Sequence, residues 1–249
     1  MKNLQTTSRV LSLLLTAAMA ACGAGHAIPV VPGAVAAPSF RPDVNRVALR
    51  SAGSFAILAG TTITNTGKTQ VTGNVGIFPG TAITGFPPGV INGTLYAADA
   101  VAKQAEMDLT VAYNSAMGQV RNPILIAGNL GGRTLKPGLY KSTSGLAVSS
   151  GDLTLDAGGN ANAVWVFQMA TGLNMTTGRK VFLTHGAKAQ NVFWAVGSSA
   201  TFGTGCSFYG NLIVYKSISL ATGSVMVGRA LARIGAVTMQ GNSIVRPVP

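Results

Sequence analysis

Acidic, histidine and cysteine side chains are where catalytic chemistry would reside in this 249-residue chain, and they are scarce: six, two and two residues. A glycosidase needs two carboxylates that face each other across a cleft. Asp152 and Asp156 are four residues apart on one expected strand, and so could approach a site together. Solvation of the neighbouring loops is the favoured interpretation of this pair.

Metal-binding and nucleophilic sites find equally little support. His185 is the one histidine beyond the N-terminal segment, and no acidic residue is close to it in sequence, whereas zinc requires three or four ligands. Cys206 has no local histidine partner, and the sequence contains neither Gly-Xaa-Ser-Xaa-Gly nor a phosphate-binding loop. We therefore predict no catalytic residue, no metal and no cofactor.

The overall charge is strongly positive, at +12, although only 10% of residues are charged and 47% are hydrophobic. A nucleic-acid-binding surface would gather the basic residues into a patch, with interleaved aromatic residues when it binds single strands. Here they are scattered singly, which argues against a nucleic-acid partner: Arg121, Arg133, Lys141, Arg179, Lys188, Arg229 and Arg233.

A repeat in the last third of the chain is the strongest organising signal. Thr204-Gly205 recurs as Thr222-Gly223, and Gly210-Asn211 recurs as Gly228-Arg229, both at an offset of 18 residues. A shortened copy begins at Val237, and looser copies occur near Ile63 and Ile83. A period near twenty with glycine at the corners is typical of a β-solenoid, whose coils stack their short strands. A β-sandwich is the alternative, but it rarely repeats one turn at a constant offset.

Alternation within the repeats separates core positions from surface positions. The apolar set is expected to fill a narrow core: Ile63, Val71, Phe202, Phe208, Leu220, Met226 and Val237. The polar set is expected to form ladders on an outer face: Thr64, Thr201, Ser219 and Thr238. Stacked strands would place these short, uncharged side chains at spacings of about 4.8 Å, and such a lattice suits a repetitive solid such as ice. For any single Thr, ordinary β-ladder packing is the simpler explanation.

The character of the chain changes between residues 95 and 119, where the spacing predicts one amphipathic helix of six or seven turns. Its apolar positions recur every three or four residues: Ala98, Val101, Ala105, Leu109, Ala112 and Ala116. The opposite side is polar: Asp99, Lys103, Glu106, Thr110 and Asn114. An Ala-rich stripe favours docking on a flat face of the solenoid, whereas a membrane-surface helix would carry bulky apolar residues opposite many basic ones.

The N-terminus predicts export. Lys2 and Arg9 precede an apolar run from Val10 that is too short to span a bilayer, and residues 1–22 are assigned to an export signal. Met19-Ala-Ala-Cys22 resembles a lipobox, in which Cys22 would be lipidated; ordinary signal cleavage is the alternative. Residues 23–46 are a Pro- and Ala-rich linker, and residues 47–249 form the solenoid domain. Cys206 is then expected to act as a small core hydrophobe.

Several blocks, in order, resemble the microbial ice-binding (antifreeze) family. They include Phe55-Ala-Ile-Leu-Ala-Gly60, Thr94-Leu-Tyr-Ala-Ala-Asp99, Ala163-Val-Trp-Val-Phe-Gln168 and the stretch from Asn191 to Gly205, so that the resemblance covers about 47–245. It implies a mainly β, discontinuous right-handed β-solenoid with one long α-helix packed alongside. It also implies adsorption to ice through a flat face, inhibition of ice growth and recrystallisation, and no catalysis.

A Thr-Ala/Gly-Xaa-Thr/Asn pattern often lines the ice-binding face of this family. Thr66-Gly-Lys-Thr69 and Thr171-Gly-Leu-Asn174 match the pattern. The expected face comprises Thr64, Thr66, Thr69, Thr201, Thr204, Ser207, Ser219, Thr222, Ser224 and Thr238. The expected partner is an ice crystal, bound by a monomer that is secreted or held at the cell envelope through Cys22. The alternative function is a non-catalytic adhesive or glycan-binding module of the envelope.

Overall fold

The structure, a computed structural model, describes residues 44–247. The expected export signal with Cys22, and the linker up to residue 43, lie outside the described residues. Arg41–Pro249 form one compact unit. Val44 and Val47 are buried within it, so the packed domain begins shortly before the expected boundary at residue 47. Within the described part, no helix is long and apolar enough to cross a bilayer.

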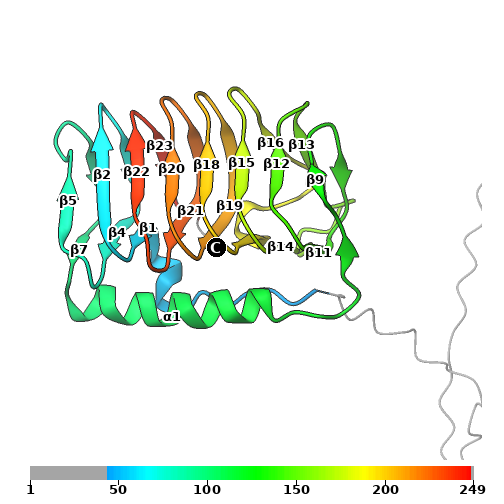
Figure 1. Cartoon of the computed structure of the whole chain (residues 1–249), viewed down its shortest axis with the longest axis horizontal. Coiled ribbons are helices and arrows are strands. Elements are labelled where there is room, and N and C mark those ends of the chain that lie inside the picture. Colours follow the sequence, from blue (N-terminus) through cyan, green and yellow to red (C-terminus); the bar gives the residue numbers. More distant parts are fainter. Residues whose placement is uncertain (1–43, 248–249) are drawn as a thin grey trace, which may run out of the picture. The chain divides into compact units, whose positions relative to one another are not determined.

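Parallel strands stack coil upon coil and build three faces, as a β-solenoid requires (Figure 1). The first, called here the eight-strand face, is a separate sheet in the spatial order β5 (Ala82–Thr84), β2 (Thr62–Thr66), β22 (Val237–Gln240), β20 (Ile218–Leu220), β18 (Ala200–Phe202), β15 (Leu173–Met175), β12 (Leu146–Val148) and β9 (Gly128–Asn129).

The second, called the helix face, lies beneath the single α-helix. Its order is β7 (Leu95–Ala97), β4 (Asn74–Ile77), β1 (Phe55–Ala59), then the second halves of β21 (Val225–Ala232) and β19 (Ser207–Val214), and then β17 (Val192–Val196), β14 (Trp165–Met169), β11 (Gly138–Ser142) and β8 (Ile124–Leu125).

The third face continues through the first halves of the long strands β19 and β21. It joins them to β23 (Ser243–Val245), β3 (Gln70–Thr72) and β6 (Val90–Asn92). A three-stranded sheet extends it on the other side: β16 (Val181–Thr184), β13 (Leu153–Asp156) and β10 (Thr134–Leu135). The short 3-10 helices η1 (Arg50–Ser54) and η2 (Ala189–Asn191) lead into β1 and β17.

The coils do not follow one another in sequence order, which confirms the discontinuous solenoid. The C-terminal strand β22 pairs with β2, and Thr238 lies opposite Thr64. Likewise, β21 pairs with β1 near the start of the domain. Figure 1 shows the consequence: the red C-terminal coils lie between the cyan N-terminal coils and the orange and yellow ones.

The interior contains the residues that the alternation predicts. All seven expected core residues, from Ile63 to Val237, are at most 1% exposed. Aromatic rings stack between coils: the ring centroids of Phe167 and Trp194 are 4.0 Å apart, and those of Phe202 and Phe208 are 4.7 Å apart. Such ring pairs add to the area that they bury, so the core favours one alignment of neighbouring coils.

The constant offset in the sequence is the register of the stacked coils. Strand β18 pairs with β20 so that Thr201 lies opposite Ser219, and β19 pairs with β21 at the same offset of 18. Gly205 and Gly223 turn the corner after the eight-strand face with φ angles of 66° and 72°. A residue with a Cβ atom rarely adopts these angles, so the repeated Thr-Gly marks a backbone requirement.

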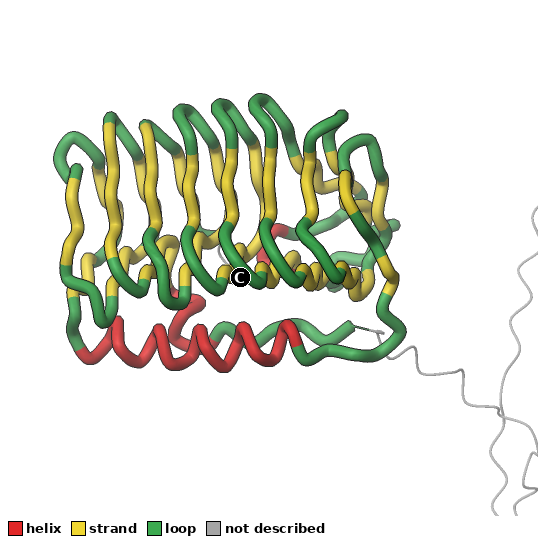
Figure 2. The backbone as a smooth tube through the Cα atoms, viewed as in Figure 1, coloured by secondary structure: helices red, strands yellow, loops and turns green. Residues whose placement is uncertain are grey.

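The helix is shorter than the sequence predicts. Helix α1 runs from Ala100 to Met117, about five turns, and begins where the Asp99 side chain accepts a hydrogen bond of 2.8 Å from the Ala102 N–H. The expected first residues, Leu95–Ala97, instead pair with β4 as strand β7. The docking prediction is confirmed, because Ala105, Leu109, Ala112 and Ala116 are fully buried against the helix face (Figure 2).

Polar contacts tie the segment before β1 and the sheet to this helix. The Ser51 hydroxyl donates to Asp108 at 2.5 Å, and Gln119 exchanges two hydrogen bonds with the backbone of Asn45. From β14, the Gln168 amide donates to the carbonyls of Ala116 and Gln119, at 2.7 and 2.8 Å. Carbonyls at a helix C-terminus lack partners within the helix, so Gln168 serves as a cap supplied by the sheet.

Glu106 is expected on the solvent side of the helix, and this expectation is wrong. The residue is 7% exposed, and its Oε1 atom has no hydrogen-bond partner among the described residues. Burial raises the pKa of Glu106 to about 9, against the smaller opposing effect of the Arg233 charge. Arg233 itself lies 5.1 Å from the ring centroids of both Tyr113 and Tyr215. The carboxyl group is therefore protonated at neutral pH.

Replacing Glu106 by Gln should stabilise the protein above pH 5. Because the pKa rises from 4.5 to about 9 on folding, the folded state holds an extra proton between these values, and its stability falls as pH rises. A deficit of about 2.5 pKa units at pH 7 costs roughly 3 kcal/mol. Urea unfolding at pH 4.5, 7 and 9 should show a growing advantage of Glu106→Gln. A variant less stable than wild type at pH 8 would contradict a neutral Glu106.

Candidate functional site

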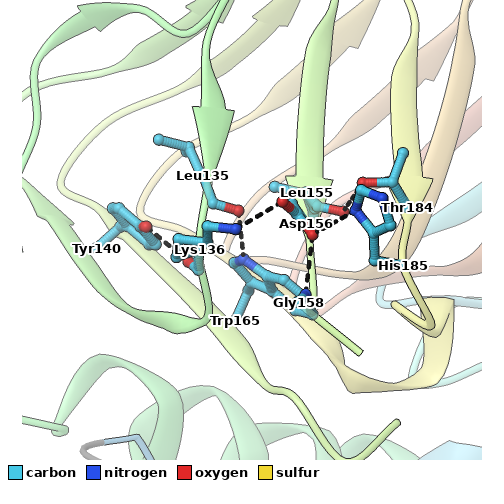
Figure 3. A network of polar contacts seen from close by, with 9 residues as sticks. All are labelled: Leu135, Lys136, Tyr140, Leu155, Asp156, Gly158, Trp165, Thr184 and His185. Atoms are coloured by element: carbon cyan, nitrogen blue, oxygen red, sulfur yellow. Dashed lines mark hydrogen bonds and ion pairs between the residues drawn. The ribbon is translucent and has the colours of Figure 1, made fainter. Parts of the chain in front are cut away.

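Asp156 and His185 meet in a polar cluster at the edge of the three-stranded sheet (Figure 3). Lys136 Nζ donates to Asp156 Oδ2 at 2.6 Å. The other oxygen, Oδ1, accepts from the Gly158 N–H and lies 2.8 Å from His185 Nδ1. His185 is a turn residue with φ 49°, as expected, but its carboxylate partner comes from a strand 29 residues earlier.

This cluster has the chemistry of a structural clamp. The bond from Lys136, followed by those from Gly158 and His185, holds the pKa of Asp156 well below its usual range. Asp152 is engaged separately: its Oδ1 accepts from the Lys180 N–H at 2.8 Å and lies 3.9 Å from Arg179 Nη1. The two carboxylates thus bind different cations, and neither resembles the raised-pKa acid of a glycosidase. The part of the chain that the structure describes has no group of three potential metal ligands.

Asp156→Asn should lower the melting temperature at pH 7 and leave it nearly unchanged near pH 2. The folded-state pKa is lowered, so the stabilisation is complete above the unfolded value of 3.8 and is lost as pH falls below it. Asp152→Asn is the matched control, since its ion pair is long at 3.9 Å, and it should cost less at pH 7. A difference between Asp156→Asn and wild type that persists undiminished at pH 2 would contradict the clamp.

Cys206 is fully buried in the solenoid core, which confirms its expected role as a small hydrophobe. Its Sγ atom lies 3.2 Å from the Thr176 carbonyl oxygen, within reach of a weak S–H donor. Burial raises the pKa of this thiol, so the thiolate that would act as a nucleophile is disfavoured.

The eight-strand face is the most regular surface of the molecule. One outward position recurs in each strand, and the pairing registers place these positions side by side. The row reads Thr84, Thr64, Thr238, Ser219, Thr201, Asn174, Ala147 and Asn129. Seven inter-strand spacings of about 4.8 Å give it a length of about 34 Å. Figure 2 shows these strands running side by side with little divergence.

This face is also free of charge. No described residue in its eight strands is Asp, Glu, Lys or Arg. The row one step earlier is equally short and uncharged, with Thr62, Ser217 and Ser199 on neighbouring coils. Charged groups hold water strongly and are costly to desolvate, whereas short hydroxyl-bearing side chains form a stiff, weakly hydrated surface. The face is therefore suited to a ligand that is itself extended and uncharged.

The sequence places four of its ten candidate residues on this central row: Thr64, Thr201, Ser219 and Thr238. Thr66, Thr204 and Thr222 are exposed, but they lie at the corner where the face ends. The Thr222 hydroxyl there lies 3.2 Å from Gln240 Oε1. These three border the face rather than occupy its centre.

Thr69 and Ser224 are wrongly assigned to the face, because both are buried at 0% and 3% exposure. Just past the corner their hydroxyls turn inward and satisfy backbone groups of neighbouring coils. Thr69 Oγ1 accepts from the Asn242 N–H at 3.0 Å and donates to Asn65, while Ser224 Oγ donates to the Gly203 carbonyl at 2.9 Å. Ser207 is half-buried in β19 on the third face.

Thr84 and Asn174 belong to the row but are absent from the sequence-based set. Thr81-Ala-Ile-Thr84 and Thr171-Gly-Leu-Asn174 enter the face in the same way, each with its fourth residue on the row. Thr66-Gly-Lys-Thr69 has the same pattern but straddles the next corner. The signal was present at residues 81–84, and what the sequence lacked was the phase of the pattern within the coil.

The far end of the face is less even than its centre. A depression of about 490 Å³ lies among small residues, including Gly128, Gly145, Ala147 and Gly172. It affects the strands β9, β12 and β15 and reaches Thr201. The continuous Thr and Ser surface is therefore formed by β5, β2, β22, β20 and β18.

Known proteins share both sequence and fold with this chain. An ice-binding protein of Nostoc sp. (strain HG1) is 42% identical over 219 residues, which cover 86% of this chain and 81% of that protein. An ice-binding protein of Flavobacterium frigoris (strain PS1) is 36% identical over 217 residues, covering 81% and 76%.

Solved structures give the same answer. An ice-binding protein from an Antarctic biological consortium superposes with a TM-score of 0.80 at 55% identity, covering 81% of this chain and 91% of that one. One from the ascomycete Antarctomyces psychrotrophicus superposes with a TM-score of 0.78 at 39% identity, covering 82% and 100%. The family model described as ice-binding-like matches residues 57–245, and the chain therefore belongs to the ice-binding-like family.

Proposed function

We propose that this protein is an ice-binding protein that adsorbs to ice through the eight-strand face and thereby inhibits ice growth and recrystallisation. The observation that carries the proposal is the uncharged row from Thr84 to Asn129, with one short side chain in each parallel strand. Its relatives named as ice-binding proteins support the ligand. The contact is a surface match spread over many residues, so it needs no pocket, metal or catalytic group.

The other two faces suit ice less well. Helix α1 covers the helix face. The third face exposes bulky apolar side chains, with Phe182 at 44% and Val225 at 42%, next to the charged Lys180. Such a surface is uneven, and its ammonium group would hold water against an approaching solid. The eight-strand face combines regular spacing with the absence of charge in its described strands.

Partition of the full chain between a slowly growing ice front and the liquid tests the ligand. Adsorption enriches the protein in the ice fraction, whereas a non-binding protein of similar size is rejected into the liquid. Rejection of this protein would overturn ice binding and would favour the adhesive or glycan-binding alternative.

We also propose that the chain is exported and acts as a monomer, on the basis of its N-terminal residues and of a site contained in one chain. Cys22 decides between a lipid-anchored and a freely secreted form. Labelling of cells with a radioactive fatty acid should mark the wild-type protein and leave Cys22→Ser unlabelled. Label that is absent from both would favour ordinary signal cleavage.

A further inference from the structure

Four arginine residues from distant parts of the chain meet at one cavity outside the eight-strand face. Arg46 and Arg50 come from the segment before β1, Arg229 from β21, and Arg246 from the residues after β23. The cavity has a volume of about 360 Å³, and Gly53, Gln190 and Phe193 also line it. Arg229 is 7% exposed, whereas Arg46 and Arg50 are exposed, so Arg229 lies at the inner end and the others surround the opening.

Arg229 is held in place by neutral acceptors. Its Nε donates to the Gly53 carbonyl at 2.9 Å, its Nη1 to Asn211 Oδ1 at 2.7 Å, and its Nη2 to the Pro247 carbonyl at 3.3 Å. Asn211 is fixed in turn by donating to the carbonyl of Val192 at 3.0 Å. Three of the five guanidinium N–H groups are thus engaged within the described chain, which fixes the plane of the group.

The countercharge at this cavity is incomplete. Asp108 lies 3.7 Å from Arg50, but the described residues place no carboxylate within ion-pair distance of Arg46, Arg229 or Arg246. Burial lowers the pKa of Arg229 to about 10, and repulsion from Arg246 and Arg46 acts in the same direction. A buried charge without a partner is costly, and a bound anion would remove much of that cost.

The repeat shows that Arg229 is not needed to complete the coil. Asn211 occupies the equivalent position one coil away and bonds to backbone carbonyls without any charge. The coil that contacts the N-terminal segment carries Arg instead, at the place where three other arginine residues gather. Guanidinium groups have a planar fork of donors that matches a phosphate group, so several around one cavity form a phosphate-binding arrangement.

We propose that the Arg46–Arg50–Arg229–Arg246 cavity is a binding site for a phosphate group, distinct from the ice-binding face. Arg229 contacts the inner oxygens, and Arg46 and Arg246 close over the outer ones. The phosphate can come from free phosphate in solution or from the headgroup of an anionic lipid. Both sources present the same anionic oxygens to the cavity.

Thermal unfolding of the full chain tests the site, with inorganic phosphate compared against chloride at equal ionic strength. Phosphate should raise the melting temperature in a saturable manner, because a ligand that binds only the folded state stabilises it. The double variant Arg46→Gln/Arg246→Gln should weaken the apparent affinity at least about tenfold. The variant Arg121→Gln/Arg133→Gln removes the same charge from two exposed residues elsewhere and should respond as wild type.

Sedimentation with vesicles distinguishes the two sources. Binding to phosphatidylglycerol vesicles, but not to phosphatidylcholine vesicles, with loss in Arg46→Gln/Arg246→Gln, assigns the site to a lipid headgroup. A response to inorganic phosphate alone assigns it to a free anion. Equal behaviour of the two double variants in both assays would overturn the proposal. Ice partition of Arg46→Gln/Arg246→Gln should stay at the wild-type level, so failure of this site and failure of ice binding are separable.

Discussion

Thr201→Tyr should remove most of the ice-binding activity while leaving the protein folded. Thr201 is an exposed residue of β18, between Ser219 on one coil and Asn174 on the next. A tyrosine ring there would stand above the row and hold a flat solid away from the neighbouring side chains. A loss of about 1.4 kcal/mol of adsorption free energy lowers the affinity tenfold, and we expect at least that change. Thermal hysteresis and ice partition measure it.

Three matched variants define the surface. Thr201→Val keeps the β-branched shape and should cost little, since shape rather than the single hydroxyl carries the match. Thr204→Tyr lies at the corner, so its effect should be smaller than that of Thr201→Tyr. Thr72→Tyr makes the same change at an exposed position of the third face and should be silent. The melting temperature of all four should stay close to that of wild type, because these side chains point to solvent.

The pattern of results also decides between faces. Full activity in Thr201→Tyr and in a parallel Ser219→Tyr would refute the eight-strand face as the binding surface. Loss of activity in Thr72→Tyr, with Thr201→Tyr unaffected, would move the site to the third face. Loss in every Tyr variant, together with lowered melting temperatures, would indicate damage to the fold instead.

Ala105→Glu should produce the largest loss of stability. Ala105 is fully buried between α1 and the helix face, within a cluster that includes Phe55, Leu58 and Leu109. A carboxylate there would lose its water and overfill a site sized for a methyl group. Burying an unpaired charge costs roughly 3–5 kcal/mol, and urea unfolding monitored by circular dichroism measures the difference.

Met107→Glu is the control for this substitution. Met107 lies two residues further along the same helix and is 54% exposed, so the same side chain would remain in water. Its free energy of unfolding should stay within about 0.5 kcal/mol of wild type. A mild effect of Ala105→Glu, similar to that of Met107→Glu, would mean that the helix is not held against the sheet in solution.

Residue types and spacing were sufficient to predict the solenoid, its core and its docked helix. The 18-residue offset became the coil register, because a strand that stacks on its neighbour must repeat its inward side chains in step. The Thr-Gly pairs marked corners, because positive φ angles at Gly205 and Gly223 restrict the residue type. The scarcity of acidic and histidine residues in the chain also argued against catalysis and metal binding.

The limits of single-strand reasoning appear at Thr69, Ser224 and Glu106. Each is polar and was expected to face solvent, yet each is buried, because a neighbouring coil or another segment covers it. The family pattern at Thr66-Gly-Lys-Thr69 has the right residues in the wrong part of the coil, while Thr81-Ala-Ile-Thr84 has them on the face. A local pattern carries no information about which side of a corner it occupies.

The sequence by itself determined the period of the coils, the inward set of side chains and the uncharged character of the chain, because alternation and turn chemistry act over a few residues. Only the tertiary structure decided which coils are neighbours, because pairs such as Thr64 and Thr238 are joined by closure of the C-terminal coil onto the N-terminal one. The same closure brings Arg46, Arg229 and Arg246 to one cavity. Such meetings depend on contacts between residues far apart in the chain, to which no local periodicity responds.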